Sequence, residues 1–286
     1  MVPTPVFELF GRPVYLYGIF IAVGIIVCMV VFFLYTAKAN MRREVQDFAF
    51  YIAILAIIGG FAAAWFFQVM YNWIETGVLN WGSTAITAMG GFIGGAVFFV
   101  AFYFGIGALV FKGEKKNYHK DDFNTILRVA PICITIAHAF GRLGCLMAGC
   151  CHGAYLGTEY VVGGIWMHCD SNGWGFYVPT QLYEALFLFV LFAVLSIMYF
   201  KRSNITHVVY LAGYGIWRFV IEFFRTDARG FTFLGLAPSQ WQSFVFIAGA
   251  IAILIIFFVK KIPFKVEIRK REQVVKEKST PETDAK

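Results

Sequence analysis

Four polar or charged residues recur along one apolar stretch of the sequence: Tyr214, Arg218, Glu222 and Arg225. Their spacings of four, four and three residues place them on one face of a helix. Arg218 and Glu222 can form an internal ion pair, which leaves Arg225 at the outer end. One glutamate cannot neutralise two arginines, so this face keeps a net positive charge. Because the guanidinium fork suits phosphate oxygens, the pattern favours an anion site over a structural ion pair.

A second pair of ionisable residues, His138 and Arg142, is also four residues apart. A buried histidine more often serves packing, so Arg142 is the stronger candidate. Gln181 and Glu184 share the face of a third helix, which we expect Pro179-Thr180 to start and cap. A capping-box role for Glu184 is the alternative to a role in the site.

These residues fall at the outward ends of three apolar stretches. They could line one cavity open to the outer leaflet, and an anionic lipid headgroup would fit it. The candidate lining residues are Arg142, Arg218, Arg225, Gln181 and Glu184. This arrangement alone does not choose between binding, transport and chemistry.

Four of the six cysteines lie at or beyond the outward end of the His138 stretch. In an oxidising compartment we expect Cys169 to pair with Cys150 or Cys151. Cys145, Cys150 and Cys151 are also candidates for a thiol role in acid–base or nucleophilic chemistry. The run Cys150-Cys151-His152 lacks the usual spacing between metal ligands, so we expect no metal, and no cofactor is expected either.

The elements that position these residues are transmembrane helices. Hydrophobic residues make up 59% of the 286-residue chain and charged residues 14%, far from the composition of soluble domains. Seven runs are long enough to cross a bilayer as helices. We place them at 14–35, 47–73, 84–111, 124–146, 181–200, 207–224 and 240–259. The fold class expected is an all-α polytopic membrane protein.

Lys and Arg alternate between the connecting segments. They follow the first, third and fifth spans and the last one, whereas 74–83 and 147–180 contain none. The positive-inside rule therefore predicts an outside N-terminus and a cytoplasmic C-terminus. Residues 1–262 form the membrane domain and 263–286 a charged cytoplasmic tail. Because most of the net charge of +7 lies in these loops and the tail, it does not indicate nucleic-acid binding.

Several motifs resemble those of the bacterial prolipoprotein diacylglyceryl transferases, in the right order over nearly the whole chain. The most specific is Tyr214–Arg225, followed by Pro179–Glu184. The others are Tyr17-Gly18, Gly90–Gly95, Gly141–Gly144 with Gly149 and Gly153, and Gln240 with Ser243.

The resemblance implies transfer of a diacylglyceryl group from phosphatidylglycerol to the lipobox cysteine of a prolipoprotein, with formation of a thioether. Arg142 and Arg218 would hold the phosphate and stabilise the departing group. Tyr17 and Glu222 would orient the substrates, and Gly153 would allow close approach. The implied partners are phosphatidylglycerol, the prolipoprotein signal peptide and membrane lipids, and the implied location is the bacterial inner membrane, with a monomeric chain.

The sequence departs from the family pattern in its proton-handling residues. Met89 stands for a signature histidine, and Val178 for another. Cys145 and Cys150 stand where asparagine and glutamate are usual, with Ala148 for a second asparagine, and no arginine occurs in 59–67. These changes indicate a divergent, cysteine-bearing branch.

Two alternatives to this transferase remain open. One is a paralogue that uses the same phospholipid cavity for another acceptor or for a thiol-dependent reaction. The other is a non-catalytic lipid-binding or transport protein.

Overall fold

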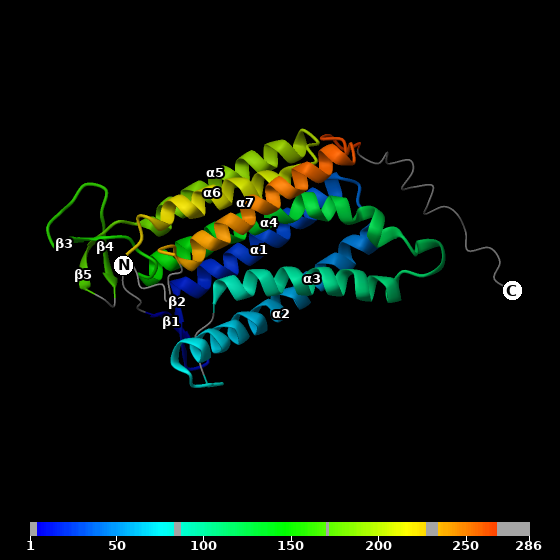
Figure 1. Cartoon of the computed structure of the whole chain (residues 1–286). Coiled ribbons are helices and arrows are strands. Elements are labelled where there is room, and N and C mark those ends of the chain that lie inside the picture. Colours follow the sequence, from blue (N-terminus) through cyan, green and yellow to red (C-terminus); the bar gives the residue numbers. More distant parts are fainter. Residues whose placement is uncertain (1–4, 83–86, 170–171, 227–233, 268–286) are drawn as a thin grey trace. The chain divides into compact units, whose positions relative to one another are not determined.

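The computed structural model describes residues 5–82, 87–169, 172–226 and 234–267. The described part of the chain divides into two compact units, one within residues 5–35 and 127–267 and the other within 36–126. The helices and strands are labelled in Figure 1.

The first unit contains every candidate site residue named above. Its helices are most of α1 (Leu16–Lys38), the larger, C-terminal part of α4 (Tyr118–Ala148), α5 (Thr180–Phe200), α6 (Thr206–Glu222) and α7 (Pro238–Val259). Helix α6 packs between α5 and α7. The rings of Phe187 on α5 and Trp217 on α6 stack with their centroids 4.4 Å apart. Phe187 lies one helical turn after Glu184, and Trp217 directly precedes Arg218.

The second unit is built on the pairing of α2 (Arg43–Thr76) with α3 (Ala88–Val110). A Cβ on Gly60 would meet the carbonyl oxygen of Gly91 at 3.1 Å, so the two helix backbones approach closely through small residues, as membrane helices often do. The glycine run of α3 therefore serves helix packing. A 3-10 turn, η1 (Gly113–Lys115), leads to the first turns of α4.

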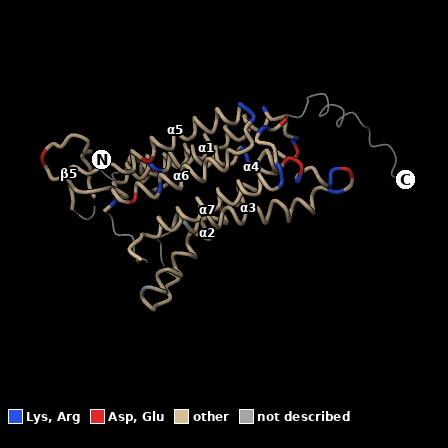
Figure 2. The backbone as a smooth tube through the Cα atoms, turned by 45° about the horizontal axis from the view of Figure 1, so that its top comes forward, with Lys and Arg blue, Asp and Glu red and all other residues tan. Residues whose placement is uncertain are grey.

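The helices carry a lipid-facing apolar surface. On α5, Leu186, Val190 and Ile197 lie on one face and are each more than half exposed, whereas Leu188 and Leu195 are fully buried. Large aliphatic side chains exposed in rows along a helix are typical of contact with lipid rather than water. Figure 2 shows mostly uncharged helices, with many of the charged residues at helix ends.

Seven α-helices are present in the described residues, and six are long and apolar enough to cross a membrane. The prediction of an all-α polytopic membrane protein is confirmed. Helix α6 does not meet the length expected of a span, because it covers 17 residues and ends at Glu222, two residues before the predicted end. The start expected at Thr84 lies outside the described residues.

The segments before α1 and between α4 and α5 contain β-structure that the sequence did not indicate. Strands β1 (Pro5–Leu9) and β2 (Arg12–Tyr15) form a hairpin before α1. Between α4 and α5, β3 (Tyr155–Gly157), β4 (Ile165–Cys169) and β5 (Gly173–Tyr177) form an antiparallel sheet in the order β3-β5-β4. This sheet begins directly after the cysteine-rich turn.

Only the first residues of the charged tail are described. They pack back on the connection between α5 and α6, where the backbone N–H of Asn204 donates to the carbonyl oxygen of Phe264 at 2.7 Å. The rest of the tail, from residue 268, lies outside the described residues.

Candidate active site

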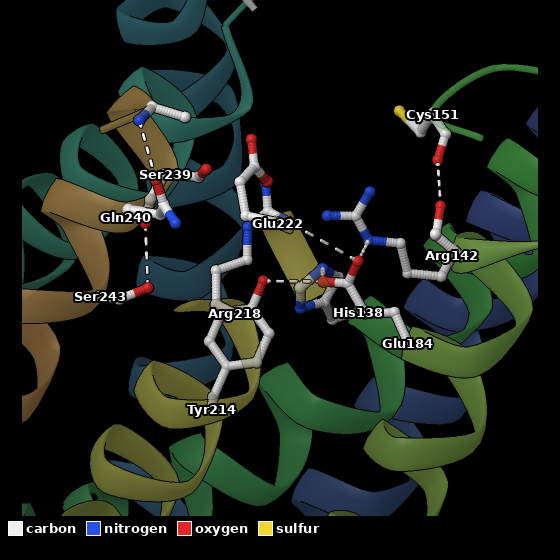
Figure 3. A network of polar contacts seen from close by, with 12 residues as sticks. His138, Arg142, Cys151, Glu184, Tyr214, Arg218, Glu222, Ser239, Gln240 and Ser243 are labelled. Atoms are coloured by element: carbon white, nitrogen blue, oxygen red, sulfur yellow. Dashed lines mark hydrogen bonds and ion pairs between the residues drawn. The ribbon is translucent and has the colours of Figure 1, made fainter. Parts of the chain in front are cut away.

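The carboxylate of Glu184 is the centre of a buried polar network in the first unit (Figure 3). Glu184 lies on the first turns of α5 and has no exposed side-chain surface. Arg142 and Arg218 approach it from two other helices, α4 and α6. The Nε atom of Arg142 lies 3.0 Å from Oε2 of Glu184, and Nη1 of Arg218 lies 4.0 Å from the same oxygen.

The other oxygen of Glu184 meets a tyrosine and a histidine. Tyr214 donates its hydroxyl hydrogen to Oε1 at 3.1 Å, and Nε2 of His138 lies 3.8 Å from that oxygen. The imidazole also meets the ring of Tyr214 edge to face. The carboxylate therefore joins α4, α5 and α6 through both of its oxygens.

Arg218 has a second carboxylate partner on its own helix. Its Nη2 atom lies 3.1 Å from Oε2 of Glu222, so the ion pair considered as the alternative to an anion site is formed. Arg142, Arg218, Glu184 and Glu222 carry two positive and two negative charges, so these four groups balance. Removing one member of such a buried group costs about 3–5 kcal/mol, because it leaves a charge without compensation.

The structure does not give Thr180 the capping role expected for this helix, nor Glu184 the capping-box role that was the alternative. Thr180 donates its hydroxyl hydrogen to the carbonyl oxygen of Cys151 at 2.8 Å, and no side chain caps the start of α5. Glu184 points inward to the arginines because two positively charged guanidinium groups stabilise a carboxylate more strongly than one neutral backbone N–H does.

A tight turn after α4 brings three cysteines together. Gly149 and Cys151 both have left-handed backbone conformations, with φ of 69° and 64°. This turn folds the chain back so that the sulfur atoms of Cys145, Cys150 and Cys151 lie within 4.8 Å of one another. A Cβ on Gly149 would collide with the carbonyl oxygen of His168, so only glycine fits there.

The start of α5 fixes the same turn. Gln181 donates from Nε2 to the carbonyl oxygen of Cys150 at 2.6 Å, while Thr180 holds the next carbonyl. Gln181 thus contacts the cysteine turn and not the arginines, although one helical turn separates it from Glu184. The two parts of the site are joined through the first turn of α5.

The disulfide expected for Cys169 is wrong. No disulfide joins Cys169 to Cys150 or Cys151 within the part of the chain that the structure describes. Cys169 is buried with Leu146, Met167 and Tyr177, because strand β4 directs it into this small core.

The pKa values of Cys150 and Cys151 are shifted in opposite directions. Hydrogen bonds from the thiols of Cys145 and Cys150 lower the pKa of Cys151 well below its usual value, and the positive charges of Arg225 and Arg142 act in the same direction. The corresponding hydrogen bonds with Cys145 and Cys151 raise the pKa of Cys150. Within the cluster, deprotonation is therefore favoured at Cys151 and disfavoured at Cys150.

Three further predicted residues surround this centre. The backbone and ring of Tyr17 lie against Gly144, where a Cβ would meet them at 3.2 Å. Gly153 packs on the end of α6, since its Cβ would lie 2.5 Å from the carbonyl oxygen of Phe224. The backbone of Gly153 also pairs with that of Arg225 in an isolated antiparallel β-bridge. The close approach at Gly153 is thus to the chain's own backbone, and it sets where Arg225 lies.

Gln240 and Ser243 organise the start of α7. Gln240 accepts a hydrogen bond from the backbone N–H of Ala237 at 3.0 Å, and Ser243 donates to the carbonyl oxygen of Ser239 at 3.0 Å. A Cβ on Gly215 would meet the carbonyl oxygen of Ser243 at 3.3 Å. These residues therefore seat α7 closely against the helix that carries Arg218.

Among the members of this network, His138 was the weakest candidate on sequence grounds. Its spacing of four residues from Arg142 was the available signal, because that spacing places both side chains on one face of α4. Met89, in contrast, belongs to the second unit and its side chain is outside the described structure.

The chain is similar in sequence to known proteins over most of its length. The family model for prolipoprotein diacylglyceryl transferase matches residues 5–256. A phosphatidylglycerol–prolipoprotein diacylglyceryl transferase of Clostridium tetani is 30% identical over 252 residues, which cover 85% of this chain and 93% of the relative.

Two other relatives match over a similar length. The phosphatidylglycerol–prolipoprotein diacylglyceryl transferase 2 of Clostridium perfringens is 30% identical and covers 85% of this chain and 91% of its own length. A transferase of the same name from Dehalococcoides mccartyi is 32% identical, with 84% and 87% covered. The chain therefore belongs to the prolipoprotein diacylglyceryl transferase family.

Proposed function

We propose that this protein transfers the diacylglyceryl group of phosphatidylglycerol to the lipobox cysteine thiol of a prolipoprotein. The observation that carries the proposal is the convergence of Arg142 and Arg218, from separate helices, on the buried carboxylate of Glu184. Family membership supplies the reaction class. The protein acts as a multi-pass enzyme of the bacterial cytoplasmic membrane, as a monomer, with its N-terminus outside.

In the reaction the bond between the diacylglyceryl carbon and the phosphate oxygen breaks. A carbon–sulfur bond forms, the thiol proton is lost, and glycerol phosphate leaves as an anion. Negative charge grows on the departing phosphate oxygen, so positively charged donors fixed beside it stabilise the transition state more than the bound lipid.

The structure supports this role for the arginines through their fixed orientation. Glu184 holds Arg142 through Nε, which leaves the terminal NH₂ groups of that guanidinium to donate elsewhere. Glu222 holds Arg218 through Nη2. Preorganised donors cost little reorganisation when the charge develops. Tyr17, Glu222 and Tyr214 would orient the substrates around this pair.

Positively charged groups around the network also favour an anionic lipid over a neutral one. The four charges of the network sum to zero, and Arg225 lies close enough to influence Cys151. Arg225 brings a third guanidinium group to this region, and guanidinium groups suit phosphate oxygens. An anionic headgroup is therefore attracted, whereas a neutral diacylglycerol gains nothing from this field.

The altered proton-handling residues support a second candidate: the same cavity with a different acceptor or a thiol-dependent step. The observation favouring it is that Cys145, Cys150 and Cys151 converge where the family pattern has other residues. Serine replacements at these three positions test it. If transfer to a lipobox peptide is unchanged, no thiol takes part.

The main proposal is tested with the purified full-length protein, phosphatidylglycerol labelled in its acyl chains and a lipobox peptide. We expect label in a thioether product and growth of a transferase-depleted strain that carries the gene. A peptide with serine for the lipobox cysteine is the control. Headgroup binding or lipid movement without product would contradict the proposal and favour a lipid-binding or transport protein.

A further inference from the structure

The cysteine turn at the end of α4 has the composition and geometry of a metal site. Sequence spacing alone argued against this, because Cys150 and Cys151 are adjacent and cannot both reach an ion along an extended chain. The left-handed conformations of Gly149 and Cys151 remove that objection. They return the turn to Cys145, and the three sulfur atoms lie within 4.8 Å of one another.

This separation nearly matches what a thiophilic ion requires. Zinc–sulfur bonds are about 2.3 Å, so two thiolates on one tetrahedral zinc lie roughly 3.8 Å apart. Closing the cluster onto an ion therefore needs each pair of sulfur atoms to approach by about 1 Å at most, which side-chain rotation can supply.

The turn is held in place by groups other than the thiols. Gln181 and Thr180 bind the carbonyl oxygens of Cys150 and Cys151, so the backbone is already set for the three sulfur atoms. The neighbouring imidazole is directed elsewhere: Nδ1 of His152 lies 2.8 Å from the carbonyl oxygen of Gly153, and its ring packs on Tyr177.

The charges around the cluster favour thiolates. Three thiolates on a divalent ion carry a net charge of minus one, and Arg142 and Arg225 supply positive charge nearby. Both guanidinium groups lie close enough to the cluster to act on it through their charge. Cys150 is exposed and Cys145 and Cys151 are partly so, so an ion can reach the sulfur atoms.

We propose that Cys145, Cys150 and Cys151 form a three-thiolate site for a thiophilic divalent ion of the Zn²⁺ type. Thiolate ligands select such ions over Mg²⁺ or Ca²⁺. Binding displaces the remaining thiol protons to solvent and involves no change of oxidation state. The site leaves a fourth coordination position on the ion for water or another ligand. The inference does not depend on the transfer reaction.

The experiment uses the full-length protein in detergent, stripped with a chelator and kept reduced with a phosphine. Cd²⁺ is added stepwise while the ultraviolet absorption of the cadmium–thiolate bond is recorded, and Zn²⁺ is then added in competition. We expect about one ion per chain, because three thiolates make one site. Each single replacement, Cys145→Ser, Cys150→Ser or Cys151→Ser, should weaken Cd²⁺ binding at least about tenfold.

Two controls separate loss of a ligand from loss of the fold. Cys28→Ser removes a thiol from α1, remote in sequence from the turn, and should leave Cd²⁺ binding unchanged. Zn²⁺ should raise the melting temperature of the wild-type protein but not that of the triple serine variant. Absence of the cadmium–thiolate band in the reduced wild-type protein, or the same stoichiometry in the triple variant, would overturn the proposal.

Discussion

Arg142 and Arg218 are held on the same carboxylate oxygen, Oε2 of Glu184, at 3.0 Å and 4.0 Å. Two guanidinium groups would repel each other without that oxygen between them. Glu184 therefore has a structural task, compensating two buried charges, and a functional one, setting the separation at which both arginines can meet one phosphate.

Glu184→Gln keeps the size of this side chain and removes its charge. Because both arginines then lose their shared counter-ion in a buried site, we expect the free energy of unfolding to fall by about 3–5 kcal/mol. Thermal unfolding in detergent measures this loss. Glu159→Gln, on the exposed part of the turn before β4, is the matched control, and an equal melting temperature for both variants would show that Glu184 compensates no buried charge.

Replacement of either arginine by lysine keeps the positive charge but removes the planar fork. We expect Arg142→Lys and Arg218→Lys each to lower the rate of diacylglyceryl transfer about 100-fold or more, as loss of a preorganised donor does. Product formation per folded molecule is the measurement.

Arg128→Lys is the control for these variants. Arg128 is a buried arginine whose Nε donates to the carbonyl oxygen of Ser203 at 2.8 Å, and it belongs to no part of the site. We expect it to lower the melting temperature while the transfer rate stays at the wild-type value. Equal transfer rates for Arg142→Lys, Arg218→Lys and Arg128→Lys would show that the planar guanidinium group is not required at positions 142 and 218.

Gly149→Ala should displace the cysteine turn. A Cβ there meets the backbone of His168 and also requires a left-handed alanine, so we expect a loss of roughly 1–3 kcal/mol or more in stability. Gly141→Ala, where a Cβ meets no atom within 4 Å, should instead stabilise α4 by about 0.5–1 kcal/mol. Melting temperatures of the two variants that shift in the same direction would contradict this difference.

The lowered pKa of Cys151 predicts an unusual dependence of its reactivity on pH. A folded pKa below the unfolded value means that the thiolate persists as pH falls, and the stability it contributes is lost only when the folded pKa is reached. In the metal-free protein the alkylation rate of Cys151 should therefore fall less steeply with falling pH than that of an ordinary thiol, which slows about tenfold per pH unit below its pKa.

Mass spectrometry of alkylated peptides gives this rate for each cysteine separately. Arg225→Gln should raise the pKa of Cys151 and restore part of the slope, since it removes one of the positive charges that stabilise the thiolate. A rate for Cys151 that rises about tenfold per pH unit, as for an ordinary thiol, would show that its pKa is not lowered.

The sequence predicted the helices well because their signals are local. Runs of about 20 apolar residues locate each span, and the predicted fifth span differs from α5 by one residue at its start. The ion pair of Arg218 with Glu222 was also predictable, because both residues lie on one helix with the spacing that makes them neighbours.

Contacts between helices were not predictable in this way. Nothing local indicates that Glu184 meets Arg142 and Arg218 rather than capping its own helix, because the choice depends on how three helices pack. The same holds for the β3-β5-β4 sheet and for the burial of Cys169. The convergence of three thiols depends on two left-handed residues, and only the glycine of that pair is a recognisable signal.

The most direct test of the central claim compares an anionic lipid with a neutral one. Binding of phosphatidylglycerol and of diacylglycerol with the same acyl chains is measured for the wild-type protein and for Arg142→Gln with Arg218→Gln. We predict that the wild-type protein prefers phosphatidylglycerol and that the double variant has lost this preference while it still binds diacylglycerol. An undiminished preference in the folded double variant would contradict the claim that these two guanidinium groups hold the phosphate.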